Sequence, residues 1–445
     1  MTNAEKFQAA SPAARERAGR PERAAALASL LDGGPRGDVL AAALLGAFLF
    51  LAVLVQRAAV STPFKDEFFF GTLYQAALEG RLPLGELFRP HNGHIYVLAK
   101  FAMWAVVRLG LPFDTLDWLQ LPLLAGAAWA FIAFARRHFE LSTAGCLAAI
   151  AVVLSPNQWA NLYWAMEIAV ALMLFFAMLA FERAGRYVQD GADRHALQAM
   201  GFALLAMCSQ GAGMVVAVLV AAIVLVNRRS RLAPALAGAD AALLVLLYAG
   251  SQALGPQESS VPGLPAGAWA GKVPGYLASY FGSVAIPAEA FGSRAAERMV
   301  GAAFFAATAA LLWIHRARLR PGAPVLWIGV FAVLTAAGIC VSRLSTGVNE
   351  PDAPRYFSMA GLGWLGLLCL GASAGRSRRS WQALILCVVL FGYVSGATSE
   401  FTTSPYRKVY LQQRQDALCA GRTEGLAFGA PEMVDLEPIR RSFCR

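Results

Sequence analysis

Long apolar stretches alternate with short polar segments along the chain from residue 39 onward. A helix needs about 20 apolar residues to cross the hydrocarbon core of a bilayer. Eleven stretches approach this length, and the fifth and sixth are short enough to form a tight hairpin. They are residues 39–56, 117–135, 142–156, 164–181, 197–209, 213–226, 234–254, 299–315, 324–342, 356–374 and 381–397. The pattern predicts an all-α polytopic membrane protein with about 11 transmembrane helices.

The composition agrees with this class. Of the 445 residues, 58% are hydrophobic and 15% are charged, and the mean hydropathy is +0.52. Soluble domains contain roughly 45–50% apolar and about 25% charged residues. The net charge of +10 comes largely from arginines between the apolar stretches. No basic face with interleaved aromatic residues is present, so the charge is better explained by orientation in a membrane than by binding to nucleic acid.

The position of residues 94–111 decides on which side of the membrane every later loop lies. This stretch is apolar but contains Lys100 and Arg108. If it lies along the membrane surface, five later arginine clusters are cytoplasmic together with the basic N-terminus, as the positive-inside rule favours. If it spans, all five clusters face outward. They are Arg136/Arg137, Arg183/Arg186/Arg194, Arg228/Arg229/Arg231, Arg316/Arg318/Arg320 and Arg376/Arg378/Arg379.

We therefore predict a surface-lying helix over residues 94–111. Its basic side chains, Lys100 and Arg108, are expected to extend to the headgroups. The side chains expected in lipid are those of Ile95, Leu98, Met103 and Val106. A second surface helix is expected at residues 269–286, which are amphipathic.

This topology divides the chain into three parts and two long outer loops. The parts are a cytoplasmic, disordered tail at 1–38 without the apolar core of a signal peptide, a membrane domain at 39–397, and an extracytoplasmic tail at 398–445. The outer loops are 57–116 and 255–298. In the outer tail, Cys419 and Cys444 either form a disulfide, which persists outside the cytoplasm, or remain free. Frequent Ala, Arg and Gly residues favour a bacterial source, and hence the inner membrane with any active site facing outward.

Two polar motifs follow the first apolar stretch, and they carry the candidate chemistry. They are Phe64-Lys65-Asp66-Glu67-Phe68 and His91-Asn92-Gly93-His94. Charged and imidazole groups at a membrane surface are costly unless they have a use. Far along the chain, Arg355-Tyr356 opens the tenth apolar stretch. A guanidinium at that position suits bidentate contact with phosphate oxygens.

With these features, the chain resembles the GT-C superfamily of integral-membrane glycosyltransferases. Asp66-Glu67-Phe68-Phe69-Phe70-Gly71 is similar to the Asp-Glu motif of protein O-mannosyltransferases and related lipid-linked sugar transferases. The resemblance covers the first third of the chain best. It implies a helical membrane fold with juxtamembrane helices, a polyprenyl-phosphate sugar as donor, and Asp66 as catalytic base or substrate anchor. His91-Asn92-Gly93-His94 stands where those families often have His-Pro-Pro, so subfamily and acceptor stay undefined.

The residues themselves fit such a transfer. A base must remove a proton from the acceptor, and positive groups must stabilise the departing phosphate. Asp66 is the candidate base, and Glu67 is an alternate base or a structural partner. The candidates for binding donor or substrate are Arg355, Tyr356, His91, His94, Lys65, Glu167 and Asn161. The alternative for the acidic motif is a solvated loop in which Lys65 neutralises both acids.

The histidines and Glu167 each leave alternatives open. If a helix starts near residue 92, His91 and His94 share a face. They then bind the donor phosphate, orient Asp66, hold a divalent cation with Asp66, or serve only as interfacial structure. Glu167 lies about one turn inside an apolar stretch, where a charge must be paired or must line a cavity.

The expected activity is that of a hexosyl- or pentosyltransferase acting with inversion on an extracytoplasmic glycan, lipid or protein. The alternative is a polytopic transporter or flippase for a lipid-linked or cell-envelope substrate. A transporter is expected to show internal repeats and polar sites near the middle of the membrane. The sequence shows no convincing repeat, and its polar residues gather in outer loops. A non-catalytic assembly partner would leave Asp66, His91, His94 and Arg355 without a shared purpose.

Overall fold

The computed structural model describes residues 35–91, 94–227, 232–254, 265–287, 292–316, 323–373, 377–422 and 436–444. The predicted N-terminal tail and the cluster Arg228/Arg229/Arg231 lie mostly or wholly outside these residues. The long helices are α2 (Pro35–Ala58), α6 (Thr115–His138), α7 (Thr143–Val153), α9 (Ile168–Asp190), α10 (Asp193–Ser209), α11 (Gly213–Val226), α12 (Ala233–Ala253), α16 (Arg294–His315), α17 (Pro324–Ser345), α18 (Phe357–Ala372) and α19 (Arg378–Cys419).

Short elements connect the long helices. They are α3 (Gly71–Leu78), α4 (Leu84–Phe88), α5 (Val97–Arg108), α8 (Trp159–Tyr163), α13 (Ala266–Trp269), α14 (Val273–Gly282), α20 (Glu437–Phe443) and the 3-10 helices η4 (Lys65–Phe70), η5 (Pro156–Gln158), η6 (Ala165–Glu167), η7 (Ala270–Lys272) and η8 (Pro354–Tyr356). The described residues form no β-strand. An isolated antiparallel bridge joins His91 to His94.

The all-helical membrane class is confirmed. Each predicted apolar stretch contains a helix. Within the described residues, 6 helices are long and apolar enough to cross a membrane: α2, α6, α9 together with η6, α16, α17 and α19. Helix α11 and most of α12 are shorter apolar helices. Since α7, α10 and α18 fall below spanning length, the number of 11 spans stays a prediction.

The helices pack closely where glycine allows it. Helix α14 lies against α16, and a Cβ on Gly301 would stand 1.8 Å from the backbone oxygen of Ala278. A Cβ on Gly282 would stand 1.8 Å from the backbone oxygen of Glu297. Only glycine permits this approach of two backbones. The predicted surface helix at 269–286 is thus helical, but one face of α14 is buried in the protein.

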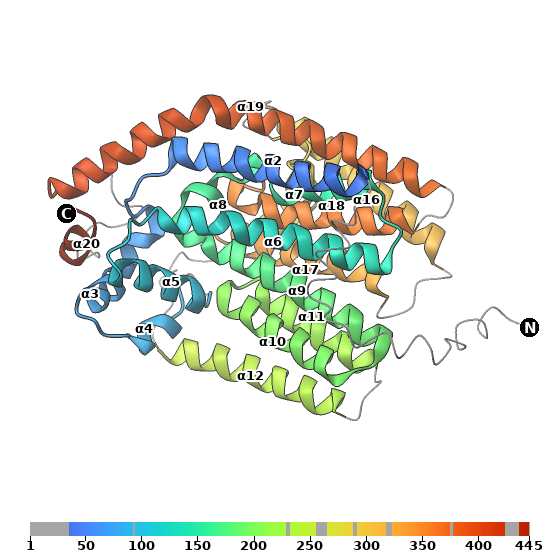
Figure 1. The fold of residues 1–445 in the computed structure, drawn as a ribbon, viewed down its shortest axis with the longest axis horizontal. Helices are drawn as coiled ribbons and strands as arrows, with labels where there is room; N and C mark the ends of the chain where they lie inside the picture. Colours follow the sequence, from blue (N-terminus) through green and yellow to red (C-terminus); the bar gives the residue numbers. More distant parts are fainter. Residues whose placement is uncertain are drawn as a thin grey trace, which may run out of the picture.

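The helices run along the long axis of the molecule between two different ends (Figure 1). The end that we call the loop end carries η4, α3, α4, α5 and α20. The opposite end, the arginine end, carries Arg137, Arg183 and Arg186, which surround the buried carboxylate of Glu182. The long first loop therefore lies at the end of the bundle opposite Arg137, Arg183 and Arg186.

The predicted environment of residues 94–111 is wrong in two respects. Met103 and Val106 are buried in a protein core that includes Tyr74, rather than exposed to lipid. Lys100 does not extend to the surface: it is 3% exposed and donates to the backbone oxygens of Glu86 at 3.0 Å and Arg89 at 2.6 Å. The cause is α4, whose C-terminal carbonyls lack helical partners and take the ammonium group as donor.

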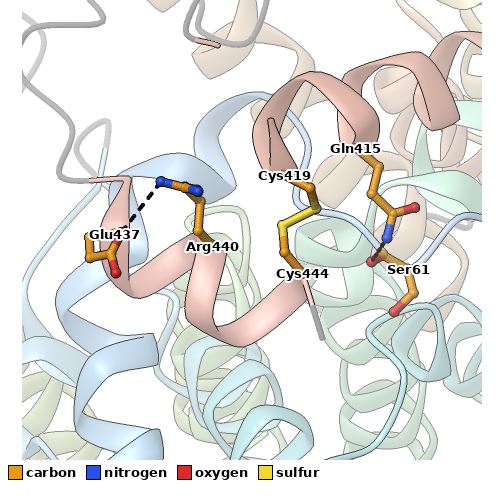
Figure 2. The surroundings of a disulfide bond; sticks show 6 residues. All are labelled: Ser61, Gln415, Cys419, Glu437, Arg440 and Cys444. Atoms are coloured by element: carbon orange, nitrogen blue, oxygen red, sulfur yellow. Dashed lines mark hydrogen bonds and ion pairs between the residues drawn. A yellow bond between two sulfur atoms is a disulfide. The ribbon is translucent and has the colours of Figure 1, made fainter. Parts of the chain in front are cut away.

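The described residues of the C-terminal segment belong mostly to two helices, α19 and α20. Helix α19 continues unbroken through Pro405 to Cys419, well beyond the predicted span. Helix α20 then packs on α3, and Phe443 lies between Tyr74 and Phe113, with ring centroids 5.2 and 4.8 Å away. Cys419 and Cys444 form a disulfide (Figure 2). The disulfide thereby joins α20 to the end of α19, and α20 packs against the loop of residues 57–116.

Candidate functional site

The two acids of the Asp-Glu motif have different surroundings. Glu67 is 0% exposed, and its carboxylate accepts hydrogen bonds from the backbone N–H of Phe64 at 2.6 Å and of Met166 at 2.5 Å. The first bond closes the capping box of η4, and the second joins η4 to η6 at the start of α9. Burial outweighs both bonds and raises the pKa of Glu67 to about 8. Glu67 is therefore a structural link between two distant segments.

Asp66 is the acid that faces outward from this link. Its side chain is 28% exposed, and its Oδ2 lies 3.5 Å from Nε2 of His91, which is 4% exposed. The histidine is held by the rings of Phe70 at 5.2 Å and Phe69 at 5.6 Å. A buried imidazole thus orients a partly exposed carboxylate. The side chain of Lys65 lies outside the described part of the structure.

A helix that starts near residue 92 would put His91 and His94 on one face, but the structure does not meet this condition. Helix α5 begins only at Val97, and His91 and His94 instead pair through their backbones, with both N–H···O distances at 2.9 Å. The ring of His94 packs on the turn before α11, where a Cβ on Gly211 would stand 2.2 Å from Nδ1. Burial, with a smaller contribution from Arg343, lowers the pKa of His94 to about 4. His94 is therefore neutral at pH 7.

Two arginines stand on either side of Tyr356. The guanidinium carbons of Arg343 and Arg355 lie 5.6 and 5.1 Å from the centre of its ring. The nearby carboxylate of Asp352 pairs with Arg294 at 3.5 Å. Within the described chain, neither Arg343 nor Arg355 forms an ion pair, and Nε of Arg355 is buried without a hydrogen-bond partner. Both cations are available to an anion.

The acidic and basic groups meet at the loop end. Glu167, 8% exposed at the start of α9, acts electrostatically on Glu67 and on Arg355. Tyr96 lies within electrostatic range of the charged side chains of Glu167, Asp66 and Arg343. The structure thus brings together Asp66, His91, His94, Tyr96, Glu167, Arg343, Arg355 and Tyr356. Sequence reasoning missed Tyr96, for which the spacing of only two residues from His94 is the available signal.

Asn161 belongs to a different polar cluster. Its Nδ2 donates to the hydroxyl of Ser358 at 2.9 Å, and this hydroxyl donates to the side chain of Gln158. The three residues lie in α8, α18 and η5, so the cluster fastens these elements together in the interior. In this structure Asn161 does not contact Asp66 or Arg355.

The arrangement supplies a carboxylate, two imidazoles and two arginines that form no ion pair within the described chain. Among the described residues, no group of three or more His, Cys, Asp or Glu side chains is placed to hold a metal ion. A divalent cation at Asp66, His91 and His94 stays a prediction that the structure does not test.

The chain matches no protein-family model, no curated protein and no solved structure.

Proposed function

We propose that the protein is a membrane glycosyltransferase of the GT-C type that uses a polyprenyl-phosphate sugar as donor. The observation that supports this best is the presence, in one region, of a partly exposed carboxylate and two arginines without ion-pair partners in the described chain. Asp66, oriented by His91, and Arg343 both act electrostatically on Tyr96. Arg343 and Arg355 stand on either side of Tyr356 and lack ion-pair partners in the described chain. This arrangement provides a base for an acceptor and a positive site for a leaving phosphate.

The proposed reaction is a single displacement. Asp66 takes the proton from an acceptor hydroxyl, and the acceptor oxygen attacks the anomeric carbon from the face opposite the phosphate. The bond between that carbon and the phosphate oxygen breaks, and the polyprenyl phosphate leaves as an anion with the electron pair. Attack from the opposite face inverts the configuration. No general acid is required, because the leaving group is already an anion.

The other site residues have defined parts in this proposal. Arg343 and Arg355 stabilise the charge that grows on the phosphate, where a low dielectric makes such contacts strong. His94, neutral at pH 7, contributes a hydrogen bond and not a charge. Glu67 holds η4 against α9 and so fixes the distance between Asp66 and Glu167. The lipid chain of the donor extends sideways into the bilayer beside the bundle.

The test is sugar transfer in membranes that contain the full-length protein. A panel of radiolabelled polyprenyl-phosphate sugars is offered to the wild type, to Asp66→Asn and to Arg355→Ala. Glu79→Gln and Arg81→Ala serve as matched controls, because these residues pair with each other at the surface of the same loop. We expect transfer to fall at least about 100-fold in Asp66→Asn and to persist in both controls. Wild-type membranes that transfer no sugar from any donor would refute the proposal.

A further inference from the structure

Helix α14 places two buried tyrosines near Tyr356, the ring that lies between the two arginines of the candidate site. Tyr276 and Tyr280 are one helical turn apart and are 2% and 0% exposed. The ring of Tyr280 lies 6.4 Å from that of Tyr356. Tyr276 is within electrostatic range of Tyr356, Arg343 and Arg355. A segment that the sequence analysis described only as a surface helix therefore reaches the centre of the site.

The hydroxyls of both tyrosines lack hydrogen-bond partners among the described residues. A buried hydroxyl without a partner costs free energy, and folded proteins pair nearly all such groups. Burial also raises the pKa of both phenols, so that they stay protonated and able to donate. The unused O–H donor of Tyr276 is thus within electrostatic range of both guanidinium groups, and that of Tyr280 belongs to a ring beside Tyr356, which lies between them. A bound group with several acceptor oxygens would satisfy all four.

We propose that Tyr276 and Tyr280 bind a phosphate group together with Tyr356, Arg343 and Arg355. This inference rests on the proposed function, because it assigns the phosphate of the lipid donor to this cluster. Phosphate offers several strong acceptors and negative charge, which suits phenolic donors and bidentate guanidinium groups. A neutral sugar fits less well, because its hydroxyls also need acceptors, and no carboxylate pairs with either arginine in the described chain. The two tyrosines are therefore binding residues and not only packing residues.

The proposal is tested by binding to the purified full-length protein in detergent. The probes are a short-chain polyprenyl phosphate and, separately, inorganic phosphate, and the readouts are affinity and the shift of melting temperature. The variants are Tyr276→Phe and Tyr280→Phe, which keep the ring and remove only the hydroxyl. Tyr406→Phe is the control, because Tyr406 is 77% exposed on α19.

We expect each tyrosine variant to weaken binding of polyprenyl phosphate about tenfold, which corresponds to one hydrogen bond to a charged group. Without ligand, both variants should melt no lower than the wild type, since the removed hydroxyl has no partner. Unchanged affinity in both variants would overturn the inference, even if the wild type transfers sugar. Weakened affinity would support it, even if no donor sugar is transferred.

The two probes separate the sources of the phosphate. A lipid source predicts that polyprenyl phosphate shifts the melting temperature at concentrations where inorganic phosphate has no effect. If inorganic phosphate alone gives an equal shift that depends on both tyrosines, the phosphate site is supported and the lipid donor as its occupant is overturned.

Discussion

At the scale of residues, the neighbouring acids Asp66 and Glu67 differ in burial and in hydrogen bonding. Both oxygens of Glu67 are engaged by backbone N–H groups from two segments, 99 residues apart in the case of Met166. Asp66 is partly exposed and turned toward His91. Glu67 therefore holds the loop in place, whereas Asp66 is exposed enough to contact a substrate.

Replacement of Glu67 by Gln is expected to destabilise the protein. The amide has one acceptor oxygen, so its NH₂ group must face the N–H of either Phe64 or Met166, at a cost of about 1–3 kcal/mol. Asp66→Asn should change stability by less than about 0.5 kcal/mol, because Asp66 is partly exposed. Thermal unfolding in detergent measures both. Equal losses in the two variants would contradict the division of tasks.

The pKa of Glu67 predicts a dependence of stability on pH. Burial raises this pKa from 4.5 to about 8, so the stabilisation is complete below pH 4.5 and is lost as the pH rises through 8. His94 has the opposite dependence, with a pKa lowered from 6.5 to about 4, but it is neutral in both states above pH 6.5. Between pH 6.5 and 8, Glu67 alone of these two groups should lower the stability, by about 2 kcal/mol.

The measurement is the melting temperature of wild type and Glu67→Gln at pH 6.5 and pH 8. We expect the wild type to lose more stability over this interval than the variant does. The same slope in both proteins would show that Glu67 does not carry the effect.

Sequence reasoning found the residues of the site better than their contacts. Asp66, His91 and Arg355 stand out because charge is rare in this chain. The sequence could not separate Asp66 from Glu67, because the separation depends on a hydrogen bond to Met166, far along the chain. It could not find Tyr276 and Tyr280 either, since buried tyrosines of an amphipathic helix look like ordinary packing residues.

At the scale of elements, the C-terminal helices hold the first outer loop in place. Gln415 of α19 donates to the backbone oxygen of Ser61 (Figure 2). The guanidinium of Arg414 lies 5.6 Å from the ring of Phe64. These two contacts hold the segment before Asp66, and the disulfide keeps α20 on α3, which follows Asp66. The sequence shows both cysteines, but it does not show that α20 packs close enough to the end of α19 for Cys419 and Cys444 to bond.

Loss of this disulfide should loosen the loop end. A bridge that closes a loop of 25 residues contributes about 3 kcal/mol. We expect Cys444→Ser to speed hydrogen exchange in α20 and α3, with no change at the arginine end. Cys387→Ser is the control, because Cys387 is a free and exposed cysteine. Exchange in α3 that is identical to the wild type would show that the disulfide does not secure the loop.

At the scale of the whole molecule, the two ends predict the orientation in a membrane. Apolar periodicity predicted the helices well, because burial in lipid or protein demands the same side chains. It overestimated exposure to lipid around α5 and α14, since a protein core is as apolar as a bilayer. The arginine clusters give the direction: the arginine end should be cytoplasmic and the loop end should face outward.

Labelling of single cysteines in intact cells tests this orientation. We expect a membrane-impermeant maleimide to label Arg81→Cys, at the loop end, without permeabilisation. Arg194→Cys, which follows α9 at the arginine end, should be labelled only after permeabilisation. Labelling in the reverse order would invert the topology and place the candidate site in the cytoplasm.

The central claim is that Asp66 is the base in sugar transfer from a lipid phosphate. Its most direct test uses purified protein in liposomes with a labelled polyprenyl-phosphate sugar, and follows donor binding and release of polyprenyl phosphate together. The account predicts that Asp66→Asn binds the donor as the wild type does and releases polyprenyl phosphate at least about 100-fold more slowly. Release at the wild-type rate from Asp66→Asn would contradict it.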